Sequence, residues 1–320
     1  MLVAGIVLTL LGFNALEGYS TIWVSSFGSL IAFGVFISKF VPLVLLALAF
    51  ALPMQTKKYN VGNEGQFLSG AVGATIFAFS FPSLPPVVAI PLLIIAGALF
   101  GAAWSVIPAL LLYKFNVNVV LSTIAMNFIA YQMVPLVALG PWHDTLSGQP
   151  STLPIPAPYQ IPAITTSVGD SLGVALALVM PLAAYFLVYK TVKGYEIRAT
   201  GDNPQAAFAF GISTRFLGPL SLLVAGGIAG LAGGIQLAGY QFRLIDGMQL
   251  NYGVLSQMIA LIAMGNPIGV LFTTILITII EVGSNAMQRT MGVPAPLVLV
   301  IEAMILLLVL IANVVRRRSK

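Results

Sequence analysis

A succession of long apolar runs, separated by short polar or proline-containing breaks, constrains this chain more than any other feature. A helix needs about 20 mostly apolar residues to cross a bilayer, and the breaks predict about ten spanning or partly spanning helices. Short runs such as 252–264 are typical of broken or re-entrant helices, and the apolar segment 20–37 is a further candidate for partial insertion. The predicted spans are residues 1–16, 38–53, 66–80, 87–112, 119–139, 171–189, 217–237, 252–264, 270–285 and 297–314.

The shortage of charged residues favours the same kind of fold. Only 7% of the residues are charged, against roughly 25% in soluble domains, and a soluble fold could not cover its surface with so few. Lipid can replace water as the solvent, because it requires no polar groups on the outer face. The sequence therefore predicts an all-α, polytopic transmembrane helical bundle in the cell membrane, formed by a single domain over residues 1–320.

The basic residues fall unevenly on the two sides of the predicted bundle, and this asymmetry orients it. With both termini in the cytoplasm, the inside loops and the tail carry most of the cations. The inside set is Lys57, Lys58, Lys114, Lys190, Lys193, Arg198, Arg215, Arg316, Arg317, Arg318 and Lys320, and the outside set is Lys39, Arg243 and Arg289. The net charge of +5 is not gathered in one basic stripe, so the pattern indicates lipid headgroups and cytoplasmic proteins as partners, and no nucleic acid.

Residue types that carry catalysis or hold metals are almost missing. The chain has no cysteine and one histidine, His143, so thiolate sites are excluded and no metal site is expected. The sequence has no GxxxxGK[ST] phosphate-binding loop. No set of His, Asp and Glu, or of Ser and Lys, falls at a plausible depth for an intramembrane enzyme. We therefore expect a transport subunit that is not an enzyme and binds no cofactor of its own.

The loop at residues 140–170 lies outside the cell in the predicted topology. Its prolines predict a stiff, extended element without a helix. Such an element suits the docking of an external partner, and a plain solvated connector is the alternative. The prolines are Pro141, Pro150, Pro154, Pro156, Pro158 and Pro162.

The loop at residues 190–216 lies in the cytoplasm in this topology. Asn203 and Pro204 predict the start of a short helix, and Gly211 predicts its end. The helix would expose Phe208 and Phe210, which suits insertion into a groove of another protein. The alternative is a helix folded back on the membrane face.

Five sequence blocks, in order along the chain, resemble the permeases of ABC importers for branched-chain amino acids, simple sugars and nucleosides. The blocks are YNVGNEGQ at 59–66, FNVNVVLSTIAMN at 115–127, GYEIRATGDNPQAAFAFGI at 194–212, AGGIAGLAG at 225–233 and GNPIG at 265–269. The first resembles the FNIGAEGQ motif of the sugar and nucleoside members, and the third resembles the family's coupling loop. The combination is most similar to the nucleoside-uptake permeases.

The resemblance implies the other parts of a transport machine. Two permeases would pair, more often as related chains than as identical ones, and ABC ATPase subunits that bind ATP and Mg²⁺ would meet their coupling loops. An extracellular substrate-binding lipoprotein would deliver a nucleoside or a simple sugar. On this chain the residues that meet the ATPase would be Glu196, Arg198, Gly201, Asn203, Pro204, Phe208 and Gly211.

Polar residues inside the apolar runs are the candidates for the substrate path, because such groups are costly in lipid and face a cavity or a partner. Amides both donate and accept hydrogen bonds, which suits a neutral, hydroxylated substrate. Bonding between helices is the structural alternative for each of them. Thr123 and Asn127 share one helical face at i and i+4. The candidates are Asn63, Glu64, Gln66, Thr123, Asn127, Gln257, Glu281 and Glu302.

The carboxylates Glu281 and Glu302 leave a second function open. Both lie in the outer half of predicted spans, where they could meet each other or an external gate, and Arg289 is the only cation near Glu281 in the sequence. They would either couple proton flow to transport in a secondary carrier or hold helices together as structural groups.

A glycine stripe marks the span at 217–237. Gly226, Gly230 and Gly234 recur at intervals of four, with Gly227 and Gly233 beside them. Small residues at this spacing let helices approach closely, so the stripe predicts a packing surface.

Overall fold

Every predicted apolar run between residues 38 and 285 forms a helix in the computed structural model, which describes residues 9, 14–163, 171–249, 251–294, 300, 304 and 307. Six of these helices are long and apolar enough to cross a membrane. The helices are α3 (Leu30–Met54), α4 (Asn63–Ser80), α5 (Pro86–Phe115), α6 (Val119–Ala138), α7 (Ser171–Lys190), α10 (Thr214–Gln236), α11 (Tyr252–Ile262) and α12 (Pro267–Thr290). The all-α membrane bundle is thus confirmed, whereas the predicted spans 1–16 and 297–314 fall almost wholly outside the described residues.

The centre of the bundle is built from α3, α4 and α10. Every residue from Phe40 to Ala51 of α3 is buried, and so is every residue from Asn63 to Thr75 of α4. The glycine stripe brings α10 against both α4 and α5, since Gly230 lies directly against Gly70 and Gly101 and leaves no room for a Cβ atom. The predicted packing surface is confirmed, because only glycine permits backbones to approach so closely.

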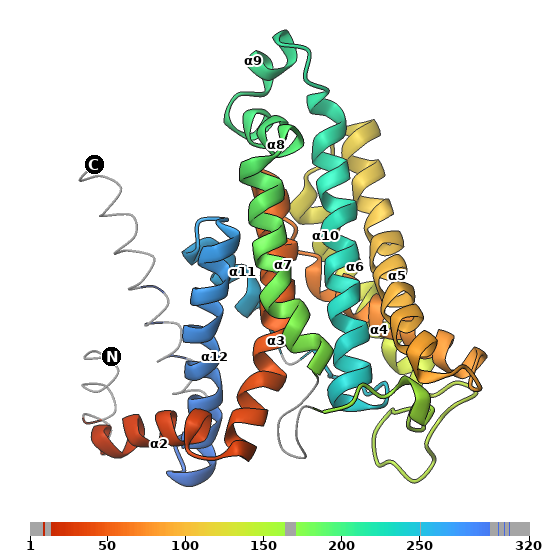
Figure 1. Ribbon diagram of the computed structural model, residues 1–320, viewed down its shortest axis with the longest axis vertical. Helices are drawn as coiled ribbons and strands as arrows, with labels where there is room; N and C mark the ends of the chain where they lie inside the picture. Colours follow the sequence, from red (N-terminus) through yellow and green to blue (C-terminus); the bar gives the residue numbers. More distant parts are fainter. Residues whose placement is uncertain are drawn as a thin grey trace.

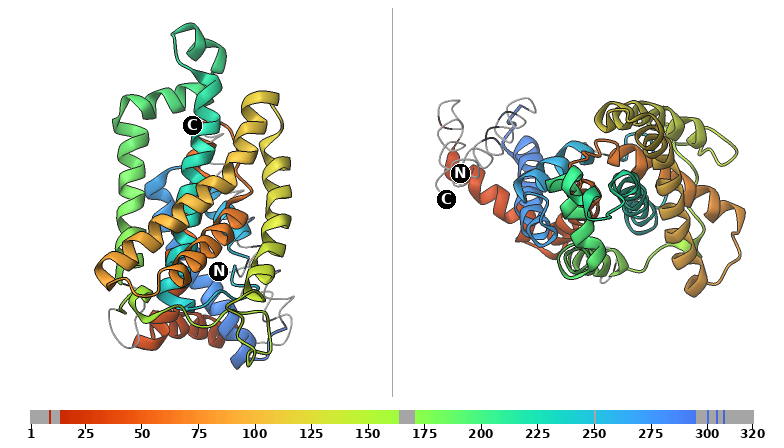
Figure 2. Two further views of the ribbon diagram at one scale, coloured as in Figure 1. Left: turned by 90° about the vertical axis from the view of Figure 1, so that its right-hand side faces the viewer. Right: turned by 90° about the horizontal axis from the view of Figure 1, so that it is seen from above.

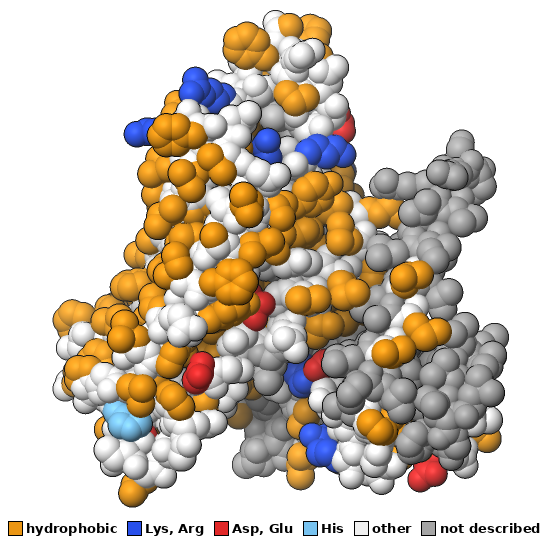
Figure 3. All heavy atoms as spheres, turned by 180° about the vertical axis from the view of Figure 1, so that it is seen from behind, with side chains coloured by type: hydrophobic (Ala, Val, Ile, Leu, Met, Phe, Trp, Pro, Cys, Tyr) orange, Lys and Arg blue, Asp and Glu red, His pale blue; other side chains and the backbone are white. Residues whose placement is uncertain are grey.

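The outer helices α5, α6 and α7 bury one side and expose the other, and large apolar side chains cover the exposed side. Figure 3 shows one face of the molecule as mostly hydrophobic, with basic side chains gathered towards the end that carries α8 (Val192–Asp202) and α9 (Pro204–Ala209). Apolar side chains facing outward are stable against lipid. The chain is a multi-pass protein of the cell membrane.

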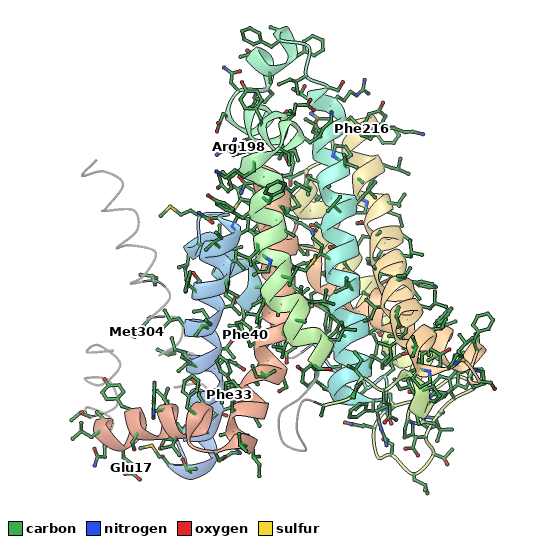
Figure 4. All side chains as sticks on the ribbon, in the orientation of Figure 1. Glu17, Phe33, Phe40, Arg198, Phe216 and Met304 are labelled. Carbon is green, nitrogen blue, oxygen red and sulfur yellow. The ribbon has the colours of Figure 1, made fainter. Side chains whose placement is uncertain are left out.

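The segment 20–37 is not a single partial insertion. Residues Ala15–Phe27 form α2, which lies across the end of the bundle opposite α8 and α9 (Figures 1 and 2), and α3 begins after a break at Gly28. The Ser29 side chain caps α3 by accepting from the Ala32 backbone N–H at 3.0 Å. A cap at this point ends one helix and starts another in a new direction. Figure 4 labels Glu17 on α2, with Phe33 and Phe40 on the neighbouring part of α3.

The proline-rich loop packs back onto the bundle at the α2 end. Its backbone N–H groups at Thr152, Ile155 and Ile161 donate to carbonyls of the segment 238–244, at distances of 2.7 to 2.9 Å. One helical turn does form, η1 (Ala157–Tyr159), which corrects the expectation of no helix. Pro156 is its N-cap residue, and Pro158 lies in its first turn, where the missing N–H and fixed φ of proline are tolerated. The segment that receives the loop includes most of a short π-helix, η2 (Leu237–Gln241), at the end of α10.

Candidate functional site

The helix α4 begins inside the bundle and not at its surface. The Asn63 side chain donates to the carbonyl of Leu46, at 3.3 Å, and Leu46 lies in the middle of α3. Leu46 is eight residues before the end of α3, which corresponds to about 12 Å of helix. The first turn of α4 therefore lies deep within the membrane-spanning part of the bundle, away from water. The backbone N–H groups of this turn have no partners within the helix and need acceptors from elsewhere in the protein.

Neutral side chains join the start of α4 to α11 and to the segment that precedes α4. Asn63 donates to the Ser256 hydroxyl at 2.8 Å, which links the first residue of α4 to α11. Asn60 and Gln66 exchange two hydrogen bonds, at 2.8 and 3.1 Å, and both are buried. We call the polar side chains around the starts of α4 and α11 the amide cluster. Its members are Asn60, Asn63, Glu64, Gln66, Asn127, Tyr131, Ser256 and Gln257.

Thr123 and Asn127 lie on the same buried face of α6, as the spacing predicts. Asn127 accepts from the Gly65 N–H at 2.9 Å and donates to the Val61 carbonyl at 3.0 Å. Thr123 donates to the Val119 carbonyl of its own helix at 2.7 Å. Asn127 thus holds the first turn of α4 and the residues just before it in place. Its side-chain amide is therefore already bonded to the protein.

Glu64 is the charged member of the cluster and receives two hydrogen bonds. The Tyr131 hydroxyl and the Gly253 backbone N–H both donate to its carboxylate. Gly253 approaches so closely that a Cβ atom there would collide with Glu64. Sequence reasoning missed Tyr131, although it lies four residues after Asn127 on the same helical face.

Gln257 differs from the other amides because it is only partly buried and weakly bonded. Its side-chain nitrogen lies 3.4 Å from the Val61 carbonyl and 3.5 Å from the Asn63 side-chain oxygen. Bonds of this length are near the limit for a hydrogen bond. Gln257 is therefore the predicted path residue whose amide is the most available to an incoming ligand.

Glu281 lies apart from the amide cluster and pairs with Lys39 of α3 at 2.7 Å. The Asn285 side chain also donates to the same carboxylate oxygen, at 2.9 Å. One expectation is wrong here, because Lys39 lies within α3 and not in an outside loop. Lys39 is the cation beside Glu281, although Arg289 is the nearest cation in the sequence. Sequence proximity could not reveal a partner 242 positions away. Glu302 lies outside the described residues.

The segment 190–216 is not a loop with one short helix but two consecutive helices, α8 and α9, which project from one end of the bundle (Figures 1 and 2). Thr191 starts α8 by accepting from the Gly194 N–H at 3.0 Å. The predicted start and end of α9 are confirmed. Asn203 accepts from the Ala206 N–H at 3.0 Å, Pro204 is the first helical residue, and Gly211 has a φ of +83°.

The phenylalanines of this segment face outward. Phe208 is 71% exposed and Phe210 is 88% exposed, while Ala207 is buried against the molecule. A short helix that buries alanine and exposes phenylalanine presents an apolar projection, which is unstable in water without a partner. Because α9 projects away from the end of the bundle (Figure 1), the geometry favours contact with another protein over a helix folded back on the membrane face.

Three further residues that were predicted to meet the ATPase lie on α8, and two of them connect this helix to the bundle. Gly201 lies directly against the Gln55 carbonyl at the end of α3, where a side chain would not fit. The Arg198 guanidinium lies 4.9 Å from the Tyr189 ring centre at the end of α7, and Figure 4 labels Arg198 at this junction. Glu196 pairs with Lys193 on the surface at 2.8 Å. The contacts of Gly201 and Arg198 hold α8 against the ends of α3 and α7.

A hollow of about 640 Å³ lies between α8 and α9. Both apolar and charged residues line it, among them Tyr195, Arg198, Asp202 and Phe210. The Arg198 Nε atom is buried and has no hydrogen-bond partner in the described part of the chain. The hollow and the phenylalanines together form a surface with both a recess and a projection.

Comparison with known proteins identifies the group to which these features belong. A family model described as "Branched-chain amino acid transport system / permease component" matches residues 32–310. A nucleoside ABC transporter permease of Lactococcus lactis is 29% identical, over 98% of this chain and 88% of its own length. A guanosine ABC transporter permease of Bacillus subtilis is 30% identical, over 98% and 91%. A glucose ABC transporter permease of Haloferax volcanii is 28% identical, over 98% and 85%. No solved structure matches the chain significantly.

Proposed function

This chain belongs to the permease components of the branched-chain amino acid transport family, and from that premise we propose that it forms the translocation path for a nucleoside or a simple sugar. It is the permease of an ABC transporter and not an enzyme, and ATP is hydrolysed on a separate subunit. The relatives named for nucleosides and glucose support this cargo class, since they align over nearly the whole chain.

The observation that carries the proposal is the amide cluster at the starts of α4 and α11. Two helices that begin within the bundle leave backbone and side-chain donors facing the interior. The neutral amides and hydroxyls there outnumber the single carboxylate of Glu64. Such a lining binds hydroxyl groups and base edges better than it binds ionised substrates. In our assignment Gln257, Tyr131 and Glu64 contact the cargo, and Asn60, Gln66, Asn127 and Thr123 hold the helices that position them.

The same proposal places the α8 and α9 end in the cytoplasm, with both termini on that side, and the proline-rich loop outside. The inside and outside distribution of basic residues supports this orientation. The exposed phenylalanines of α9 then meet the ATPase, and the outer end meets a substrate-binding lipoprotein. A second permease, more plausibly a related chain than an identical one, completes the path. ATP and Mg²⁺ bind to the partner ATPase, and no cofactor is assigned to this chain.

The alternative of a proton-coupled secondary carrier is set aside. The chain belongs to a family of ABC permeases. Glu281, one of the two carboxylates on which that alternative depended, is ion-paired with Lys39. This ion pair joins α12 to α3, which favours a structural role for Glu281.

Uptake into liposomes tests the proposal. The chain is reconstituted with its ATPase, second permease and lipoprotein, and the uptake of radiolabelled guanosine, glucose and leucine is measured. We expect ATP-dependent uptake of guanosine or glucose and none of leucine. Uptake of leucine alone would refute the cargo class, and uptake that follows a proton gradient at constant ATP would refute the mechanism.

A further inference from the structure

Four basic side chains from three separate parts of the chain line one hollow of about 620 Å³, at the end of the molecule that carries α8 and α9. Lys57 and Lys58 follow α3, Lys114 lies in the last turn of α5, and Arg215 lies in the first turn of α10. Neutral donors complete the lining, among them Asn116, Thr200 and Thr214, and no Asp or Glu lines it.

The positive charges of this hollow are not neutralised by the described part of the protein. None of the four cations takes part in an ion pair among the described residues. Arg215 is held in position but keeps its charge, since it donates to the Tyr113 carbonyl at 3.2 and 3.3 Å and lies 5.0 Å from the Tyr113 ring centre. Like charges repel one another, so the folded chain is more stable when an anion lies between them.

The start of α10 adds to the same positive potential. Its N-cap residue, Ser213, makes no side-chain hydrogen bond to the first turn. The free N–H groups of a long helix carry a partial positive charge and favour an anion nearby. A hollow with four cations, an uncapped helix start and no carboxylate is suited to a group with several acceptor oxygens.

We propose that this hollow binds a phosphate group, supplied by the headgroup of an anionic phospholipid. The cations lie at the ends of α3, α5 and α10, the level at which headgroups lie beside a membrane protein. Apolar surface is also present in the lining, at Leu112 and Pro219. A soluble phosphate compound offers the same chemistry without an acyl chain. The inference goes beyond the proposed function, because the bound group is not the cargo.

Native mass spectrometry of the purified full chain tests this assignment. The chain is titrated separately with phosphatidylglycerol, with phosphatidylcholine and with inorganic phosphate. The fraction of the protein that retains each bound ligand is measured. Lys114→Gln is compared with Lys190→Gln, because both lysines are exposed in the last turn of a spanning helix but only Lys114 lines the hollow. Removal of one cation should weaken phosphatidylglycerol retention about fivefold, and the double variant Lys57→Gln/Lys114→Gln should weaken it further. Lys190→Gln should bind as the unchanged chain does.

The outcomes separate the sources of the phosphate. Retention of phosphatidylglycerol that depends on Lys114 and resists inorganic phosphate supports a lipid headgroup. Displacement by inorganic phosphate with the same dependence on Lys114 supports the site with a soluble ligand. Equal retention by Lys114→Gln and Lys190→Gln overturns the site. Loss of ATPase association in Lys114→Gln with unchanged lipid retention also overturns it, since the hollow would then hold an acidic segment of a protein.

Discussion

The Gln55 side-chain amide donates a hydrogen bond of 2.7 Å to the carbonyl of Gly265. Gln55 ends α3, and its own carbonyl lies directly against Gly201 of α8. Gly265 lies in the corner between α11 and α12, with a φ of +72°. One residue therefore connects α8, which we propose lies beside the ATPase, to the helix that carries Ser256 and Gln257.

Breaking this connection should uncouple transport from ATP hydrolysis. Gln55→Leu removes the hydrogen bond to Gly265, which contributes about 1 kcal/mol, without touching the α9 surface. We expect substrate uptake to fall several-fold while the ATPase still binds and hydrolyses ATP. The control is Gln132→Leu, since Gln132 is exposed on α6 and should be replaceable. An unchanged ratio of uptake to hydrolysis in Gln55→Leu would contradict this role.

The exposed Phe208 should anchor the ATPase. Phe208→Asp places a charge in an apolar contact, and loss of one central aromatic anchor costs about 2 kcal/mol or more. We expect the affinity for the ATPase to fall at least about 30-fold, as measured by co-purification at several salt concentrations. Phe115→Asp is a matched control, because Phe115 is also 71% exposed and lies at the end of α5. Equal ATPase binding by both variants would remove α9 from the interface.

Gln257 should act on the substrate and not on folding. Its long hydrogen bonds and partial exposure mean that Gln257→Leu removes little from the packed protein. We expect uptake to require roughly tenfold more substrate, the effect of about 1.4 kcal/mol, with unchanged assembly and thermal stability. A change in thermal stability alone, with normal uptake kinetics, would assign Gln257 to packing.

Asn127 should show the opposite behaviour. Asn127→Ala leaves the Gly65 N–H without its side-chain acceptor and leaves the Val61 carbonyl with only the long contact from Gln257. An unsatisfied buried polar group costs about 1–3 kcal/mol, so we expect a lower unfolding temperature of the purified chain. Reduced uptake is expected only in proportion to the loss of folded protein. Unchanged thermal stability with a selective loss of uptake would instead place Asn127 on the substrate path.

The ion pair between Lys39 and Glu281 should stabilise the contact between α3 and α12. Glu281→Leu leaves Lys39 unpaired in a partly buried position, which costs on the order of 3 kcal/mol. The double variant Lys39→Leu/Glu281→Leu removes both charges and should recover most of that stability, as measured by thermal unfolding. ATP-dependent uptake should persist in the double variant. Its complete loss, with normal folding, would reveal a direct part in transport.

Much of this protein follows from the sequence because its strongest signals are local. The apolar runs predict the spanning helices, since the cost of exposing a backbone to lipid leaves little choice of structure. The boundaries of α9 follow from Asn203, Pro204 and Gly211, because capping depends on residues a few positions apart. The face shared by Thr123 and Asn127 follows from helical spacing alone.

The tertiary structure decided which distant groups meet. Lys39 and Glu281, Asn63 and Ser256, and Gln55 and Gly265 are each joined by contacts across about two hundred residues, and no periodicity encodes such pairs. The packing also decided that Asn127 supports a helix start while Gln257 stays available. Burial and competing partners determine how far a polar side chain is free to bind a ligand, and both depend on the assembled bundle.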